Sequence, residues 1–230
     1  MSGPRYALYY APAPAHPLWT RASAWLGRDA ADGAEVDRPP FPELADLDLD
    51  ALTEDPRHYG FHATLTAPFE LAPEKSEAEL AAHAATFAAD RRTFTADIAP
   101  DALGPFLAFR PAGDASEIQA LHEACVRGFH AFRARLSDFD LARRRKAPLT
   151  PAQDALLVEW GYPYVFGEFR FHMTLTGRIA DAEVRGRVLA ALSAHFADLA
   201  GPHRFESVAI FKQPTREAPF HVLAQAPFGS

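Results

Sequence analysis

The feature that most constrains this chain is a hexapeptide that occurs twice. The pattern Phe-His-x-Thr-Leu-Thr stands at 61–66 and again at 171–176, an offset of 110 residues (171 minus 61). Alternation of β-branched or aromatic residues with polar ones predicts a strand over 59–66 and another over 169–176. Alternate residues of a strand share a face. Each strand therefore presents three polar side chains on one face: His62, Thr64 and Thr66 in the first, His172, Thr174 and Thr176 in the second.

The elements that follow the two copies also repeat. After each copy the residue patterns predict one helix and then two strands: from 76, 93–98 and 106–110, and from 181, 205–211 and 220–224. Such a repeat indicates an internally duplicated α+β unit. We expect a single bilobal domain over 1–230, with pseudo-repeats at about 57–112 and 167–226. Short connections favour antiparallel pairing, so two antiparallel sheets should face a central cleft with helices outside.

The rest of the chain gives weaker signals. The sequence predicts a strand at 5–10 and helices at 18–26, from 116 and at 150–160. Residues 28–56 are rich in Asp, Ala and Pro, and predict a long connection with one helical turn near 44–52. The basic run at 143–146 predicts a solvated loop, with phosphate binding as the alternative.

Composition and charge exclude some classes of function. The formal net charge is −7, from 23 basic and 30 acidic residues, which argues against a protein that coats a long nucleic acid. A small anionic substrate needs only a local positive site. The lone cysteine, Cys125, cannot form an intramolecular disulfide and suits a reducing compartment. Without a membrane-length apolar run or a signal-peptide pattern, we expect a cytoplasmic monomer with no membrane partner.

The duplicated residues suit acid–base chemistry. Imidazole has an unperturbed pKa of about 6.5, so one His can be neutral and the other protonated near pH 7. Threonine hydroxyls can donate to phosphoryl oxygens. This set matches hydrolysis of a phosphodiester. Zinc is the competing use of two His residues, but no third ligand stands at a metal-binding spacing. We therefore expect no metal and no cofactor.

Two His-x-Thr motifs in a duplicated α+β chain resemble the 2H phosphoesterase superfamily. The longer sequence patterns resemble those of the branch found beside phosphonate-utilisation genes, and the resemblance covers most of the chain. It is carried by four stretches: YGFHATL with APF at 59–69, LTP at 149–151 with Gln153, WGYPYV at 160–165 and FHMTLTG at 171–177. The resemblance implies metal-independent hydrolysis of a cyclic phosphodiester by His62, Thr64, His172 and Thr174. In this branch it implies a small sugar cyclic phosphate, such as ribose cyclic phosphate.

Further residues are candidates for substrate binding. Lysine is common in the family where Thr66 stands, so that charge must come from elsewhere in this chain. Arg170 lies two residues before His172 and should therefore share its face of the strand. Tyr164 could stack on a sugar. Thr66 and Thr176 are the remaining candidates, with strand formation as their alternative role.

The roles within the pair and the substrate class have alternatives. We expect His172 to activate water and His62 to protonate the leaving ribose oxygen, although the pseudo-symmetric sequence does not decide this order. One rival function is an RNA-end 2′,3′-cyclic phosphodiesterase or ligase-like enzyme, which the net charge disfavours. The other is a non-catalytic nucleotide-binding module. Histidines without a paired context, such as His122, are expected to be structural.

Overall fold

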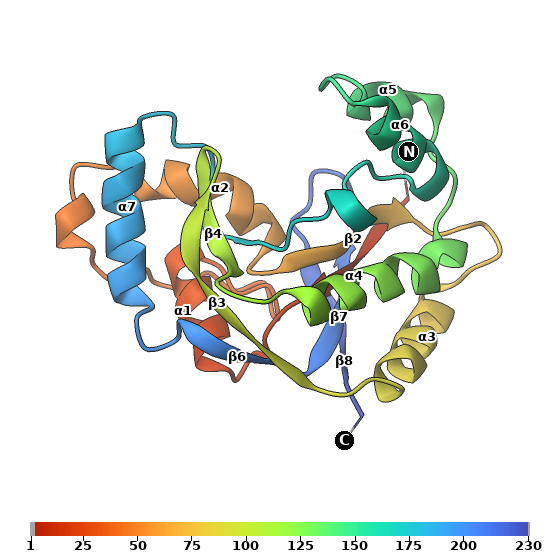
Figure 1. The fold of residues 1–230 in the computed structure, drawn as a ribbon, viewed down its shortest axis with the longest axis horizontal. Helices are drawn as coiled ribbons and strands as arrows, with labels where there is room; N and C mark the ends of the chain where they lie inside the picture. Colours follow the sequence, from red (N-terminus) through yellow and green to blue (C-terminus); the bar gives the residue numbers. More distant parts are fainter. Residues whose placement is uncertain (1–2, 230) are drawn as a thin grey trace.

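A computed structural model describes residues 3–229. Within them, eight strands form one sheet in the order β6-β3-β4-β5-β2-β1-β7-β8, with every neighbouring pair antiparallel (Figure 1). The strands are β1 Arg5–Tyr10, β2 Ala63–Glu70, β3 Phe94–Leu103, β4 Phe106–Pro111, β5 Met173–Thr174, β6 Gly201–Phe205, β7 Ser207–Gln213 and β8 His221–Pro227. The α+β class is confirmed, but the prediction of two separate sheets is wrong because the strands form one continuous sheet.

The sheet is narrowest at its middle. β5 has two residues, and it pairs with β2 only through Ala63 opposite Met173. Four strands lie on each side of this join. The half with β5 contains β4, β3 and β6, and the half with β2 contains β1, β7 and β8. The strands β3 and β4, which follow the first His motif, therefore lie in the half that holds the second motif, and β7 and β8, which follow the second motif, lie in the half that holds the first.

The second predicted strand, 169–176, is corrected to two residues. The amides of Leu175 and Thr176 both donate to the carbonyl of Leu107, at 2.8 and 3.2 Å, which ends the regular ladder. The alternation itself is confirmed in both motifs, since Phe61, Ala63, Leu65, Phe171, Met173 and Leu175 are all buried. Each motif therefore turns its apolar side into the core and leaves its His side chain half-buried.

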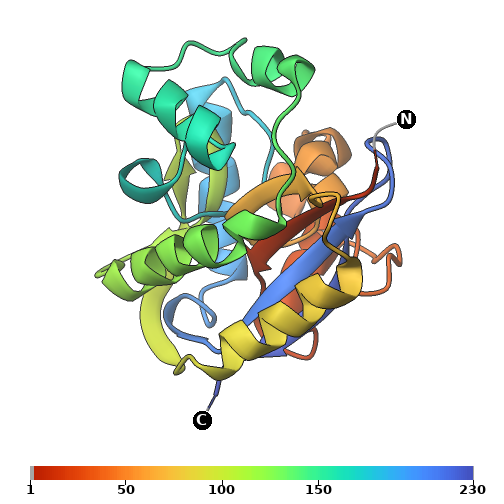
Figure 2. The ribbon, with the colours of Figure 1, turned by 90° about the vertical axis from the view of Figure 1, so that its right-hand side faces the viewer.

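Seven α-helices surround the sheet within the described residues. They are α1 Pro17–Leu26, α2 Leu49–Tyr59, α3 Glu77–Ala89, α4 Ser116–Phe129, α5 Asp138–Arg144, α6 Pro151–Trp160 and α7 Ala182–His195, with 3-10 turns η1 Pro42–Leu44, η2 His130–Phe132 and η3 Phe166–Glu168. None of the helices in 3–229 has the length and apolar character needed to cross a bilayer. α3 packs on β7 and β8, α4 on β2 and β3, and α7 on β3 and β4 (Figure 2).

Helix α5 corrects the predicted loop at 143–146. The hydroxyl of Ser137 accepts a hydrogen bond from the amide of Asp140 at 3.1 Å and caps the helix. Two aspartates lie in its first turn and two arginines in its last. This distribution stabilises a helix through its macrodipole, so the basic run is the end of a short helix.

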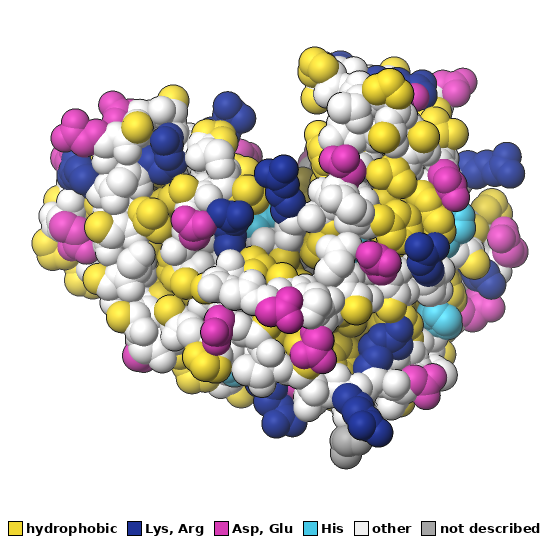
Figure 3. Space-filling view, in the orientation of Figure 1, with side chains coloured by type: hydrophobic (Ala, Val, Ile, Leu, Met, Phe, Trp, Pro, Cys, Tyr) yellow, Lys and Arg dark blue, Asp and Glu magenta, His cyan; other side chains and the backbone are white. Residues whose placement is uncertain are grey.

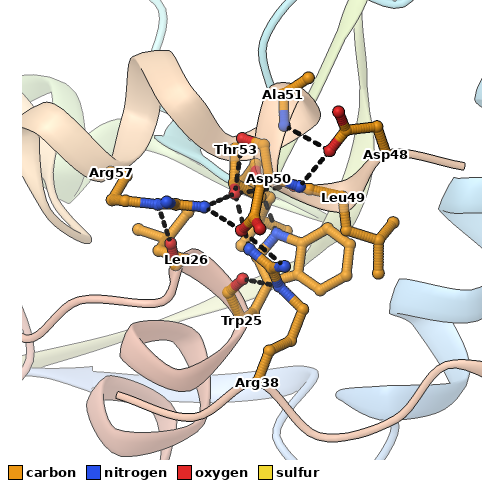
Figure 4. Close-up of polar contacts among 10 residues, drawn as sticks. Trp25, Leu26, Arg38, Asp48, Leu49, Asp50, Ala51, Thr53 and Arg57 are labelled. Atoms are coloured by element: carbon orange, nitrogen blue, oxygen red, sulfur yellow. Dashed lines mark hydrogen bonds and ion pairs between the residues drawn. The ribbon is translucent and has the colours of Figure 1, made fainter. Parts of the chain in front are cut away.

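Helix α2 corrects the irregular connection predicted across 28–56. Arg38 and Arg57 join it to α1 (Figure 4). Arg57 Nε donates to the carbonyl of Leu26 and Arg38 Nε to that of Trp25, both at 2.8 Å. Both guanidinium groups also bind the hydroxyl of Thr53. Pro56 lies inside this helix, and because proline ordinarily ends or kinks a helix, the residue pattern did not predict one here.

Gly60 links α2 to the first His motif in a conformation that glycine alone adopts readily. Its φ is 79° and its ψ is 175°, a region that is essentially restricted to glycine. A Cβ atom at this position would lie 2.4 Å from the Cβ of Ala30. The helix can therefore end three residues before His62 only because Gly60 has no side chain.

We expect Gly60→Ala to lower the free energy of unfolding by about 2–4 kcal/mol, through backbone strain and overpacking. Gly33→Ala is the matched control, because Gly33 has a φ of 81° and nothing within 4 Å of an added Cβ. It should cost about 1–2 kcal/mol, from backbone strain alone. Ala30→Gly should restore part of the loss in the Gly60 variant. Urea denaturation measures all four proteins, and equal losses from both glycine substitutions would contradict the overpacking.

Candidate active site

The pairing of β2 with β5 brings the two motifs together. With Ala63 opposite Met173, the antiparallel register carries His62 toward Thr174 and His172 toward Thr64. Residues opposite one another in such a pair have Cβ atoms about 4.5–5.5 Å apart. The four polar side chains of the two motifs therefore gather on one face of the sheet, and each His lies beside the Thr of the other strand.

These side chains line one cleft, made of three adjoining pockets. A pocket of about 330 Å³ holds Thr64 and His172, and one of about 210 Å³ holds His62 and Thr174. A third, of about 290 Å³, holds His62, Thr64 and Thr174. Phe106 is common to the first two pockets. In the space-filling view the molecule is hollowed between the part with α7 and the part with α5 and α6, with basic and His side chains in the hollow (Figure 3).

The ring of His62 is held at its face and at one nitrogen. It stacks on the buried Tyr9, with ring centroids 3.8 Å apart and planes inclined by 23°. Its Nδ1–H donates to the carbonyl of Gly60 at 2.9 Å, so Nε2 is the unprotonated, basic nitrogen, and it accepts from the hydroxyl of Thr64 at 3.3 Å. Burial, and then the nearby charge of His172, lower the pKa of His62 to about 4.

His172 repeats this arrangement. Its Nδ1–H donates to the carbonyl of Arg170 at 2.7 Å, again two residues earlier in the chain. Its ring lies 5.7 Å from that of Phe106. Burial, and the charge of Arg110, lower the pKa of His172 below its ordinary value of 6.5. The sequence predicts one neutral and one protonated His near pH 7, whereas the structure favours the neutral form of both when no ligand is bound.

The remaining predicted site residues divide into two groups. Arg170 and Tyr164 are exposed and line the pocket of about 330 Å³ beside His172. Thr66 is not among the described residues that line the three pockets. Its hydroxyl oxygen is buried and has no hydrogen-bond partner among the described residues. Thr176 is 1% exposed, and its hydroxyl accepts from the amide of Leu107 at 3.0 Å and donates to the carbonyl of Gly177 at 2.9 Å. Thr176 lines the pocket of about 210 Å³ beside His62, but its hydroxyl is bound to the main chain.

The cleft contains basic residues that the sequence did not single out as site residues. Arg5, Arg143 and Arg144 line the pocket of about 290 Å³ together with His62 and Thr64. The run at 143–146 was the one available signal, and it predicted a solvated loop, with phosphate binding as the alternative. Nothing in the pattern around Arg5 distinguishes it from an ordinary strand residue. Across residues 3–229, no group of three or more His, Cys, Asp or Glu side chains is placed to hold a metal ion.

A buried histidine links the first motif to the segment that precedes the second. The side chain of His122, on α4, is 1% exposed. Its Nδ1–H donates to the carbonyl of Leu65 at 2.9 Å, and its Nε2 accepts from the amide of Phe166 at 3.1 Å. Its ring stacks on Phe169, with centroids 3.7 Å apart. Burial lowers the pKa of His122 to about 4, so the neutral ring that both bonds require persists at neutral pH.

Two curated relatives match almost all of this chain. One, from Janthinobacterium sp. (strain Marseille), is 39% identical over 229 residues, which are 97% of this chain and 51% of the relative. The other, from Laribacter hongkongensis (strain HLHK9), is 37% identical over 218 residues, 95% of this chain and 50% of the relative. Both are described as ribose 1,5-bisphosphate phosphokinase PhnN. The chain spans about half the length of these relatives.

A solved structure also aligns along the whole chain. The protein TT0787 of Thermus thermophilus covers 98% of this chain and 99% of its own, with a TM-score of 0.47 and 14% identity. A family model described as "Protein of unknown function (DUF1045)" matches residues 64–221. The match begins at Thr64 of the first motif and contains the second motif with His172 and Thr174. Because it covers more than half of the 230 residues, the chain belongs to the DUF1045 family.

Proposed function

We propose that this chain hydrolyses the cyclic phosphodiester of a small ribose phosphate, without a metal ion. The observation that carries the proposal is the matched presentation of two imidazoles. Each Nδ1 is bound to a carbonyl two residues earlier, at 2.9 Å for His62 and 2.7 Å for His172. The Nε2 of His62 lies 3.3 Å from the hydroxyl oxygen of Thr64, and both imidazoles line a cleft that also holds the hydroxyl of Thr174. The resemblance of the two His-x-Thr motifs to 2H phosphoesterases supports the same chemistry.

The two imidazoles supply the proton transfers. His62 Nε2 removes a proton from water as its oxygen attacks phosphorus. The bond from phosphorus to the leaving ribose oxygen breaks, and protonated His172 Nε2 gives its proton to that oxygen. The product is an open phosphomonoester. His62 then releases its proton to solvent, and His172 takes up a proton from solvent. Thr64 and Thr174 donate hydrogen bonds to the phosphoryl oxygens as negative charge develops on them.

The environment of the rings favours this order of roles. Burial against Tyr9 lowers the pKa of His62 to about 4, so that ring is neutral, as a general base must be, over most of the pH range. An anionic phosphate bound beside His172 favours its charged form and can recruit the proton that the acid step needs. The sequence alone assigned the roles in the opposite order, without a residue to decide between them.

The relatives' description bears on the substrate. It names a ribose bisphosphate, which fits a phosphorylated ribose in this chain's cleft and a place in phosphonate metabolism. The described kinase activity is a property of proteins about twice as long. This chain's sequence contains no Gly-x-x-x-x-Gly-Lys-Ser/Thr loop, the phosphate cradle of P-loop phosphotransferases. Hydrolysis therefore accounts for the residues in the cleft better than phosphoryl transfer from a nucleotide.

A substrate screen with phosphorus NMR of the products tests the assignment. Ribose 1,2-cyclic phosphate or a related sugar cyclic phosphate should open to a phosphomonoester with no nucleotide added. Turnover that requires ATP and magnesium would instead favour a phosphokinase. Faster opening of cyclic-ended RNA would favour an RNA-end enzyme, and binding without turnover of any cyclic phosphate would favour a nucleotide-binding module.

We expect His62→Ala and His172→Ala each to lower turnover by about 10²-fold or more. The double variant should lose much less than the product of the two effects, because the groups act as a unit. Bis(4-nitrophenyl) phosphate, whose leaving group needs no proton, separates the roles. With it the His172 variant should recover most of its rate and the His62 variant should not. The opposite pattern would reverse the assignment, and near-full activity in either single variant would overturn it.

The two threonines should contribute through their hydroxyl groups. Thr64→Val and Thr174→Val keep the shape of the side chain but remove the donor, and each should lower turnover by about 10–10³-fold. Thr→Ser at the same positions should keep much more activity. Thr66→Val is the matched control on the same strand, and it should leave turnover unchanged. Steady-state kinetics distinguish these cases, and indistinguishable Val and Ser variants would show that the hydroxyl is not used.

The pH dependence of kcat/KM reports the ionisations of the free enzyme. It should be bell-shaped and displaced toward acid, because the pKa values of both His residues are lowered there. The rate should fall below pH of about 4 as His62 becomes protonated. It should fall again as pH rises past the pKa of His172, which lies below 6.5. Prior dialysis against a strong chelator should leave the profile unchanged. A maximum above a pH of about 7.5, or activity that returns only with added metal, would contradict this mechanism.

A further inference from the structure

The two motif imidazoles differ in what lies against their faces. The ring of His62 stacks on that of Tyr9, with centroids 3.8 Å apart and planes inclined by 23°. Among the described residues, the one aromatic ring beside His172 is that of Phe106, 5.7 Å away and inclined by 56°. The two imidazoles have matching backbone contacts, but only one of them lies flat against a second ring.

The register of the strands explains this difference. Tyr9 lies opposite Thr64 in the pairing of β1 with β2, and Ala108 lies opposite Thr174 in the pairing of β4 with β5. Residues opposite one another in an antiparallel pair share a face of the sheet. Tyr9 and Ala108 therefore occupy equivalent places in the two halves. One half presents a phenol ring to its motif, and the other presents a methyl group.

Tyr9 is itself held firmly. It is 1% exposed and belongs to a small core cluster with Phe211 and Phe220, whose ring centroids lie 5.0 and 6.1 Å from its own. Its hydroxyl is hydrogen-bonded to the side chain of Thr64. Burial holds the pKa of Tyr9 well above its ordinary value of 10, so the ring is uncharged. His62 thus lies on a fixed and neutral plane.

We propose that Tyr9 is a positioning residue that makes the two imidazoles unequal and holds His62 in the orientation of the general base. This inference rests on the proposed function and deepens it, because it names what separates the roles within the pair. The carbonyl of Gly60 holds one edge of the His62 ring, and Tyr9 holds its plane. His172 has the first constraint, from the carbonyl of Arg170, and among the described residues it has no stacked ring. Precise aim matters most for the group that must meet a small, unbound water molecule.

The same contact acts on the protonation of His62. A face covered by a neutral ring cannot be hydrated, and this disfavours the charged imidazole. The π electrons of Tyr9 attract a cation and act in the opposite direction. Burial prevails, since it is the largest cause of the lowered pKa of His62, which is about 4. The stacked ring therefore keeps Nε2 of His62 able to accept a proton.

Other titratable or charged side chains line the two pockets that hold His62. They are Arg5, Tyr59, Arg143, Arg144 and Tyr162 in the one of about 290 Å³, with Asp55 and Arg178 in the one of about 210 Å³. The charge that contributes to the lowered pKa of His62 is that of His172, after burial. A substitution of Tyr9 leaves all these groups in place, so it tests the covered face alone.

Nitrogen NMR of the histidine rings, titrated against pH without substrate, tests the inference independently of turnover. In the native protein, His172 should take up its proton at a higher pH than His62. Tyr9→Leu removes the flat ring and admits water to the face of His62, so the pKa of His62 should rise by about 1 or more. Tyr9→Phe keeps the ring and should leave this pKa nearly unchanged.

Tyr10→Leu is the matched control. Tyr10 is also 1% exposed, but it packs in the main core, with its ring 4.4 Å from that of Phe205. Both leucine variants lose a buried phenol, yet Tyr10→Leu should leave the titration of His62 unchanged. If Tyr9→Leu does not fold, the native protein and Tyr9→Phe still decide the question. Protonation of His62 before His172 as the pH falls, or loss of their difference in Tyr9→Phe, would overturn the inference.

Kinetics separate this inference from the proposed function. On a ribose cyclic phosphate, Tyr9→Leu should lower kcat by about tenfold or more with little change in KM, and it should move the acid limb of the pH profile to higher pH. The loss should persist with bis(4-nitrophenyl) phosphate, because the affected step is proton removal from water. Tyr9→Phe and Tyr10→Leu should keep most of the rate.

The outcomes distinguish the two claims. Native turnover together with an unchanged kcat and an unchanged His62 titration in Tyr9→Leu would overturn the role of Tyr9 and leave the hydrolysis standing. The expected titrations with no cyclic phosphate opened would do the reverse. Equal losses of kcat in Tyr9→Leu and Tyr10→Leu would show that Tyr9 only stabilises the fold, and would also overturn the inference.

Discussion

The contact on which the site depends is the single backbone pair that joins the two halves of the sheet. Ala63 and Met173 lie opposite one another, and each stands between the His and the Thr of its own motif. The pair therefore fixes two imidazoles and two hydroxyls at once, with a precision that neither strand has alone. His122 supports the join from behind, since it binds the carbonyl of Leu65 and the amide of Phe166. A neutral, buried imidazole thus supports the segments that carry the two motif histidines.

The sequence predicted the elements whose signals are local. Alternation located both motifs and gave the correct faces, and the capping residues at Ser76 and Thr150 located two helix starts. The sequence could not predict that the strands join in one sheet, because pairing between strands that are distant in the chain leaves no local pattern. Helix α2 was missed because it contains Pro56, a residue that ordinarily ends a helix. The sequence predicted β5 to be too long, because it could not show that the amides of Leu175 and Thr176 share the carbonyl of Leu107, which ends the regular pairing of β5 with β4.

The same distinction applies to the site. The residues with a repeated pattern, His62 and His172, were found, and the structure brings them into one cleft. Tyr9 and Arg5 belong to a strand with no motif, and only the pairing of β1 with β2 brings them to the cleft. Arg144 carried a signal as part of a basic run, but charge alone does not show what a side chain faces. Sequence patterns identify reactive groups more readily than the surroundings that tune them.

The exchange of strands between the halves has a consequence for how the molecule forms. Phe94 pairs with Phe205, and Arg5 pairs with Gln213, 208 residues away. Loops of this size must close before either half of the sheet is complete, and their entropy slows folding. A chain divided between the repeats would leave each fragment with open strand edges, which invite aggregation. Each half of the sheet contains strands from both the N-terminal and the C-terminal part of the chain, so neither half, nor the cleft beside their join, can form from one part of the chain alone.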